Sequence, residues 1–170
     1  MFVTKKTRVK DLTPFLNNQD KVNELIDLFP EYPLKKDVLQ MTVGEFCNLY
    51  INEEEYLNDI LKPRERAYIA FGRLKSYRNQ MNSLADYFKR FEIKLTQEEK
   101  AASIGVDMPD MPERILLDCV KAYHLHSTKE AEDLPITDWI LVLKDQSSNA
   151  RYQRNYSKII EQKSKAHRKK

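Results

Sequence analysis

The apolar residues between Pro63 and Glu92 recur at alternating steps of three and four. This spacing places side chains on one side of an α-helix. Pro63 suits a first helical turn, because the N–H that it lacks would have no partner there. The pattern predicts one long helix over about 63–92, roughly 45 Å in length, around which the rest of the chain is organised. Its apolar seam consists of Ala67, Ala70, Leu74, Tyr77, Met81, Leu84, Phe88 and Phe91.

A repeat of this kind has two structural interpretations. A two-stranded coiled coil uses such a seam, but it prefers branched aliphatic side chains there. The seam of this chain contains two alanines and several aromatic residues, and Phe71 and Tyr87 widen it. We therefore expect a central helix that is buried by its own chain, with an exposed seam for a partner helix as the alternative.

Helix-starting signals recur along the rest of the chain. In a capping box, a Ser or Thr and a Glu three residues later satisfy each other's backbone N–H groups. An asparagine alone can also cap a helix. The chain contains three such pairs and one such asparagine: Thr42 with Glu45, Thr96 with Glu99, Ser127 with Glu130, and Asn18. These signals predict short helices, and Pro112 predicts the start of another.

A second long helix is predicted from Ile136 to about Lys163. Its inner side would consist of Trp139, Ile140, Leu143, Ala150, Ile159 and Ile160. Residues 161–170 contain no apolar side chain larger than alanine, so we expect a basic tail there.

The N-terminal residues have a different pattern. Apolar residues alternate loosely with lysine and arginine over residues 1–13, which is typical of an extended arm or a short strand, and we expect this arm over about 1–16. The whole pattern predicts a mostly α protein, a helical bundle around one long central helix. We expect one domain over residues 1–160, followed by the tail at 161–170.

Composition limits where the protein acts. The chain has 170 residues, of which 41% are hydrophobic and 32% charged, as in a folded and soluble protein. No apolar run is long enough to cross a bilayer, and the first residues lack the apolar centre of a signal peptide. Cys47 and Cys119 lie among apolar neighbours, as buried free thiols do in a reducing compartment. We expect a cytoplasmic protein without a membrane contact or a disulfide.

Residues able to perform chemistry are few. The three glycines are far apart, and none lies in a phosphate-binding arrangement. His124 and His126, with Cys119 nearby, are a weak candidate for a metal site, and a helix C-terminus explains the two histidines equally well. We therefore expect no metal ion, no cofactor and no catalytic residue.

Positive charge is concentrated at the C-terminus. From Arg151 onward the chain has eight Lys or Arg and one acid, a net charge of +7, so the net charge of +3 leaves −4 for residues 1–150. Cations interleaved with aromatic residues can bind phosphates and stack bases, or can dock on an acidic protein surface. A solvated helix end is the third interpretation. The candidate interaction residues are Arg151, Arg154, Tyr156, Lys158, Lys163, Lys165, Arg168, Lys169 and Lys170.

Three segments carry a resemblance to a known group of proteins. They are TVGEF at Thr42–Phe46, the arginine-rich central helix, and the stretch from EAEDLPITDW to ARYQRNYSKII. Together they resemble small helical proteins of tailed bacteriophages, which include tail assembly chaperones and ring or adaptor proteins of the head-to-tail junction. The resemblance implies a non-catalytic protein that docks onto copies of itself or onto other virion proteins, in the host cytoplasm or within the virion. Nucleic-acid binding through the basic tail is the alternative function.

Overall fold

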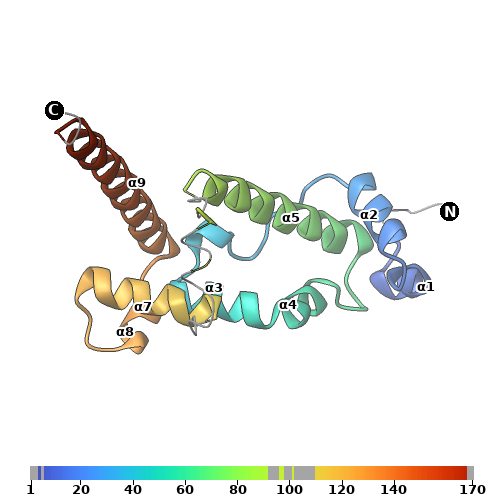
Figure 1. The fold of residues 1–170 in the computed structure, drawn as a ribbon. Coiled ribbons are helices and arrows are strands. Elements are labelled where there is room, and N and C mark those ends of the chain that lie inside the picture. The colour runs from blue at the N-terminus through green and yellow to red at the C-terminus, as the bar shows by residue number, and fades with distance from the viewer. Residues whose placement is uncertain (1–3, 5, 92–95, 98–100, 102–109, 168–170) are drawn as a thin grey trace.

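The structure, a computed structural model, describes residues 4, 6–91, 96–97, 101 and 110–167. Every regular element in these ranges is helical (Figure 1), so the predicted mostly α fold is confirmed. The elements are η1 (Val9–Leu12), α1 (Thr13–Leu16), α2 (Gln19–Leu28), η2 (Val38–Gln40), α3 (Val43–Ile51), α4 (Glu53–Ile60), α5 (Ala67–Lys89), α7 (Met111–Tyr123), α8 (Thr128–Glu132) and α9 (Ile136–His167).

Helix α5 is the central helix and contributes to two hydrophobic cores. Its N-terminal half, with Ala67, Phe71 and Leu74, packs against residues of η1, α2 and α4. Its C-terminal half, with Tyr77 and Leu84, packs against residues of α3, α7 and the start of α9. Figure 1 shows α5 running alongside the layer formed by α3 and α4. The seam is therefore covered by its own chain, as the sequence predicts, although Met81, Phe88 and Phe91 are only half-buried.

The start of α5 differs from the prediction. The helix begins at Ala67 and not at Pro63, because the loop before it pairs with the N-terminal segment. The carbonyls of Pro63 and Glu65 accept hydrogen bonds from Lys10 and Val9 at 3.1 and 3.0 Å. The N–H of Ala67 donates to the carbonyl of Thr7 at 2.8 Å. In a helix that began at Pro63, the N–H of Ala67 would donate to the Pro63 carbonyl, but its single proton is already given to Thr7.

The same bonds explain why the N-terminal prediction is wrong. The expected arm or strand over residues 1–16 is, in its described part, a 3₁₀ turn followed by the short helix α1. Val9 and Leu12 are buried, so η1 is part of the body. Among the described N-terminal residues, the only strand-like feature is an isolated β-bridge between Arg8 and Arg66.

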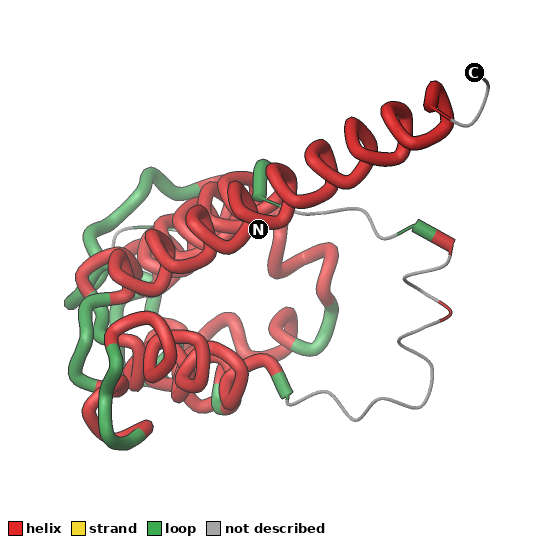
Figure 2. Tube along the Cα trace, turned by 60° about the vertical axis from the view of Figure 1, so that its left-hand side comes forward, coloured by secondary structure: helices red, strands yellow, loops and turns green. Residues whose placement is uncertain are grey.

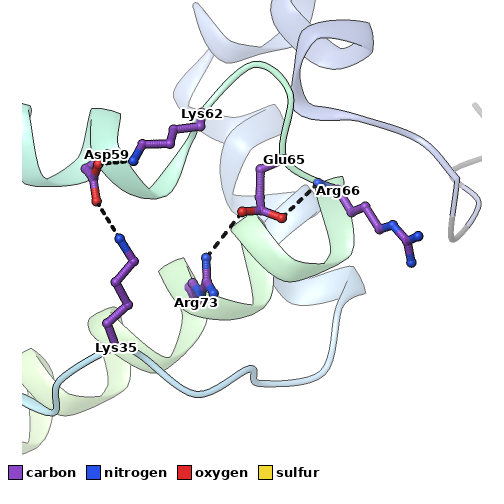
Figure 3. A network of polar contacts seen from close by, with 6 residues as sticks. All are labelled: Lys35, Asp59, Lys62, Glu65, Arg66 and Arg73. Atoms are coloured by element: carbon purple, nitrogen blue, oxygen red, sulfur yellow. Dashed lines mark hydrogen bonds and ion pairs between the residues drawn. The ribbon is translucent and has the colours of Figure 1, made fainter.

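A polar network on the surface supports the turn between α4 and α5 (Figure 3). The carboxylate of Asp59 lies 3.3 Å from Lys35 and 2.5 Å from Lys62. Glu65 accepts a hydrogen bond from the backbone N–H of Arg66 and lies 3.5 Å from the guanidinium of Arg73. The two pairs of Asp59 are exposed and contribute little stability each, whereas the pair of Glu65 with Arg73 is partly buried.

The segment between α2 and η2 crosses α5 at Gly72. The N–H of Tyr32 donates to the carbonyl of Gly72 at 3.1 Å, and the hydroxyl of Ser76 donates to the carbonyl of Tyr32 at 2.9 Å. A Cβ at position 72 would lie 2.7 Å from the carbonyl oxygen of Pro30. Only glycine allows so close an approach of two backbones.

The predicted caps have different outcomes. The capping box of Thr42 and Glu45 forms both of its hydrogen bonds. The Asn18 side chain accepts a hydrogen bond from the N–H of Lys21, as a helix cap does. Ser127 accepts from the N–H of Glu130, but that glutamate accepts from His126 and not from Ser127, so only half of this box forms. The third box, predicted for Thr96 and Glu99, cannot be compared because position 99 lies outside the described residues. Pro112 is in the first turn of α7, which begins one residue earlier.

Helix α9 begins at Ile136 as predicted and continues through His167, four residues beyond the predicted end. Its first turns bury Trp139 and Ile140 in the core, and the Ser147 hydroxyl donates to the carbonyl of Phe91 at 2.9 Å. None of the helices in the described ranges has the length and the apolar composition that crossing a membrane requires.

Candidate interaction surface on the C-terminal helix

The distal part of α9 extends away from the body. Figures 1 and 2 both show its C-terminal turns beyond the rest of the bundle. Where the helix leaves the body, the guanidinium of Arg151 donates to the carbonyl of Arg90 at 2.7 Å, which satisfies a free carbonyl at the end of α5. From Tyr152 to Lys165 every residue is exposed except the half-buried Arg154.

Four large side chains form a stripe along this extension, which we call the apolar stripe: Tyr152, Tyr156, Ile159 and Ile160. They are 63%, 51%, 49% and 46% exposed. Their spacing of four, seven and eight residues from Tyr152 places them on one face of the helix. The prediction that Ile159 and Ile160 lie on the inner side of α9 is therefore wrong, because the body ends before the helix reaches them.

The two tyrosines of the apolar stripe contact each other. Their ring centroids are 6.2 Å apart, and the ring planes differ by 16°. Stacking of residues four apart restricts both side chains and supports the helix that carries them. The stripe therefore presents an aromatic surface of defined shape before any partner binds.

The candidate cations fall largely on the opposite face of α9. Helical spacing places Arg151, Arg154, Lys158 and Lys165 away from the apolar stripe, and Lys165 pairs with Glu161 at 2.5 Å. Lys163 differs, since it follows Tyr156 by seven residues and Ile159 by four and shares their face. The remaining predicted cations, at positions 168–170, lie outside the described residues. Cations and aromatic residues that alternate in the sequence therefore lie mostly on two different faces of the helix.

The cysteines and histidines do not form a reactive site in the described part of the chain. Cys47 and Cys119 are buried free thiols, and burial raises the pKa of each to about 11. His124 ends α7 in a left-handed conformation with φ 52°, and both His124 and His126 are exposed. The described residues contain no group of three or more His, Cys, Asp or Glu able to hold a metal ion. Thiols of such high pKa are poor nucleophiles.

Comparison with known proteins does not assign a role to this surface. No protein-family model matches the chain, and no curated protein or solved structure is significantly similar to it.

Proposed function

We propose that this protein is a non-catalytic assembly protein that acts through protein–protein contacts, with the apolar stripe of α9 as its docking element. We further propose that it is a virion component or a virion-assembly component of a bacteriophage. The second part of the proposal rests on the resemblance of its sequence segments to small phage proteins.

The observation that carries the proposal is the apolar stripe. Two tyrosines and two isoleucines occupy one face of an extension that the body does not cover. Leaving this area in water costs about 25 cal/mol for each Å² that a partner would bury. Exposed aromatic residues on a helix, at a spacing of four and seven, are the anchors by which a helix occupies a groove of another protein.

Nucleic-acid binding is the competing function, and the geometry favours it less. Two cations of the basic face already have protein partners: Arg151 caps α5, and Lys165 pairs with Glu161. The tyrosines that would stack on bases share their face with Lys163, whereas the other four described cations lie on the opposite face, so most phosphate contacts and the stacked bases would be bound from opposite sides.

Site-specific photocrosslinking tests the proposal directly. Tyr156 is replaced by a photoreactive phenylalanine, and the protein is irradiated in the cells that naturally produce it. We expect a protein adduct that is lost when Ile159→Asp is added. Tyr50, which is 52% exposed on α3, is the matched control position and should give no adduct.

The outcomes separate the two functions. An adduct whose added mass is removed by nuclease would show that the extension binds nucleic acid. Absence of any adduct at position 156, in cells where the full-length protein accumulates, would show that the apolar stripe does not dock onto another molecule.

A further inference from the structure

A pocket of about 640 Å³ opens on the body between η2, the C-terminal half of α5 and the start of α9. Its apolar lining comes from all three elements: Val38, Leu39, Leu84, Tyr87 and Ile140. Leu39 is 56% exposed at this site, so it leaves apolar surface open to a ligand. The volume lies within the range of pockets that bind substantial apolar groups, about 300–1,000 Å³. We call this pocket the body groove.

The body groove is acidic. Among the residues that the structure describes, the charged lining residues are Glu31 and Asp37, and no described Lys, Arg or His lines the groove. Each carboxylate accepts a hydrogen bond of 2.7 Å from a neutral amide, Asn79 for Glu31 and Gln80 for Asp37. No ion pair within the described residues neutralises either one. An apolar ligand that also brings a positive charge therefore matches this groove.

The apolar stripe has the complementary chemistry. Tyr156, Ile159 and Ile160 supply apolar and aromatic groups, and Lys163 adds a cation on the same face one turn further on. This distal segment also belongs to the +7 end of the chain, whereas the groove belongs to the part with a net charge of −4. Attraction between the two parts would favour their encounter.

The stripe cannot occupy the groove of its own chain. Ile140, which lines the groove, and the residues of the stripe belong to the same continuous helix α9. At 1.5 Å per residue, Tyr152 to Ile160 lie about 18–30 Å further along the axis than Ile140. A continuous helix does not fold back on itself, so the groove can receive only the stripe of another chain.

We propose that the apolar stripe of one copy of this protein docks in the body groove of a second copy. This inference rests on the proposed function and names the partner. The two surfaces differ, so the contact is heterologous, and each added copy offers a new stripe and a new groove. Repetition of such a contact closes into a ring or continues as an open chain.

Two complementary variants test the contact. Leu39→Asp damages the groove and leaves the stripe intact, whereas Ile159→Asp damages the stripe and leaves the groove intact. Both residues are about half exposed, so both variants should keep the core and the melting temperature. Ile51→Asp is the matched control, because Ile51 is 63% exposed on α3 and lines neither surface.

Light scattering across a concentration series reads out the result. The average molar mass of the wild type and of Ile51→Asp should rise with concentration above the 20.2 kDa of one chain. Each of the other two variants should require about tenfold or more higher concentration for the same rise. A mixture of Leu39→Asp and Ile159→Asp should associate again, because the first variant brings an intact stripe and the second an intact groove. The mixed pair should stop at twice 20.2 kDa, since its other groove and its other stripe are both damaged.

Other results would overturn the inference in recognisable ways. If Leu39→Asp associates like the wild type while Ile159→Asp does not, the stripe binds another surface, such as a second stripe. If the wild type stays monomeric at all concentrations, self-association is excluded. The proposed function would survive that result if the photocrosslink from position 156 still captured a protein, and it would fail if no protein adduct formed.

Discussion

Replacing Gly72 by alanine tests the central packing of the bundle. An alanine usually stabilises the interior of a helix by about 1 kcal/mol relative to glycine. Here the added Cβ would lie 2.7 Å from the carbonyl oxygen of Pro30 and 2.7 Å from the Cβ of Tyr32. Both neighbours belong to the segment that crosses α5, so the strain cannot be relieved by rotation of a flexible side chain.

The expected cost follows from these contacts. Overpacking of this kind costs about 1–3 kcal/mol. Displacing the crossing segment would also weaken the bonds of Tyr32 with Gly72 and Ser76, each contributing about 1 kcal/mol. After the gain in helix propensity, we expect the free energy of unfolding to fall by about 1–3 kcal/mol.

Urea denaturation measures this change through the shift in midpoint at constant slope. Asn82→Ala is the control, because Asn82 is an exposed residue of α5 and should gain only a few tenths of a kcal/mol. A Gly72→Ala protein as stable as the wild type or more stable would mean that the segment from Phe29 to Asp37 does not cross α5 at this point.

Three further predictions concern single sites. Trp139 is 2% exposed, so its native fluorescence should be shifted to the blue of the denatured emission, and equal maxima would place it at the surface. Thr42→Ala removes a cap from α3 and should cost about 1 kcal/mol in a thermal melt, most of which Thr42→Ser should restore. Cys47 and Cys119, with pKa values of about 11, should react with a thiol reagent at pH 8 about 100-fold more slowly in the native than in the unfolded protein, and equal rates would contradict their burial.

The buried parts of the fold could be predicted because local sequence signals and packing agree there. The three-four spacing from Ala67 to Leu84 marks a face that the structure buries, and the Thr42–Glu45 box needs only residues within one helical turn. The start of α5 could not be predicted in this way. It depends on backbone bonds between Val9 or Lys10 and a loop more than fifty residues later in the chain, which leave no local signal.

Composition predicts the residue types of the candidate interaction surface but not their arrangement around the helix. The sequence leads us to expect that Tyr156 acts together with the cations of α9 and that Ile159 and Ile160 belong to the core. The spacing of a helix shows which residues share a face but not whether the body reaches that face. Length was the available signal, because even the predicted helix over 136–163, about 42 Å long, exceeds the dimensions of a small domain.

Hydrogen exchange along α9, measured by mass spectrometry at several protein concentrations, tests the central claim most directly. Residues 136–147 are anchored in the core and should exchange slowly at every concentration. Residues 152–165 are exposed apart from the half-buried Arg154, so we expect their amides to exchange fast in dilute protein and to become protected as copies associate. Slow exchange of residues 152–165 in dilute, monomeric protein would contradict the account, because it would mean that the chain's own body holds the apolar stripe.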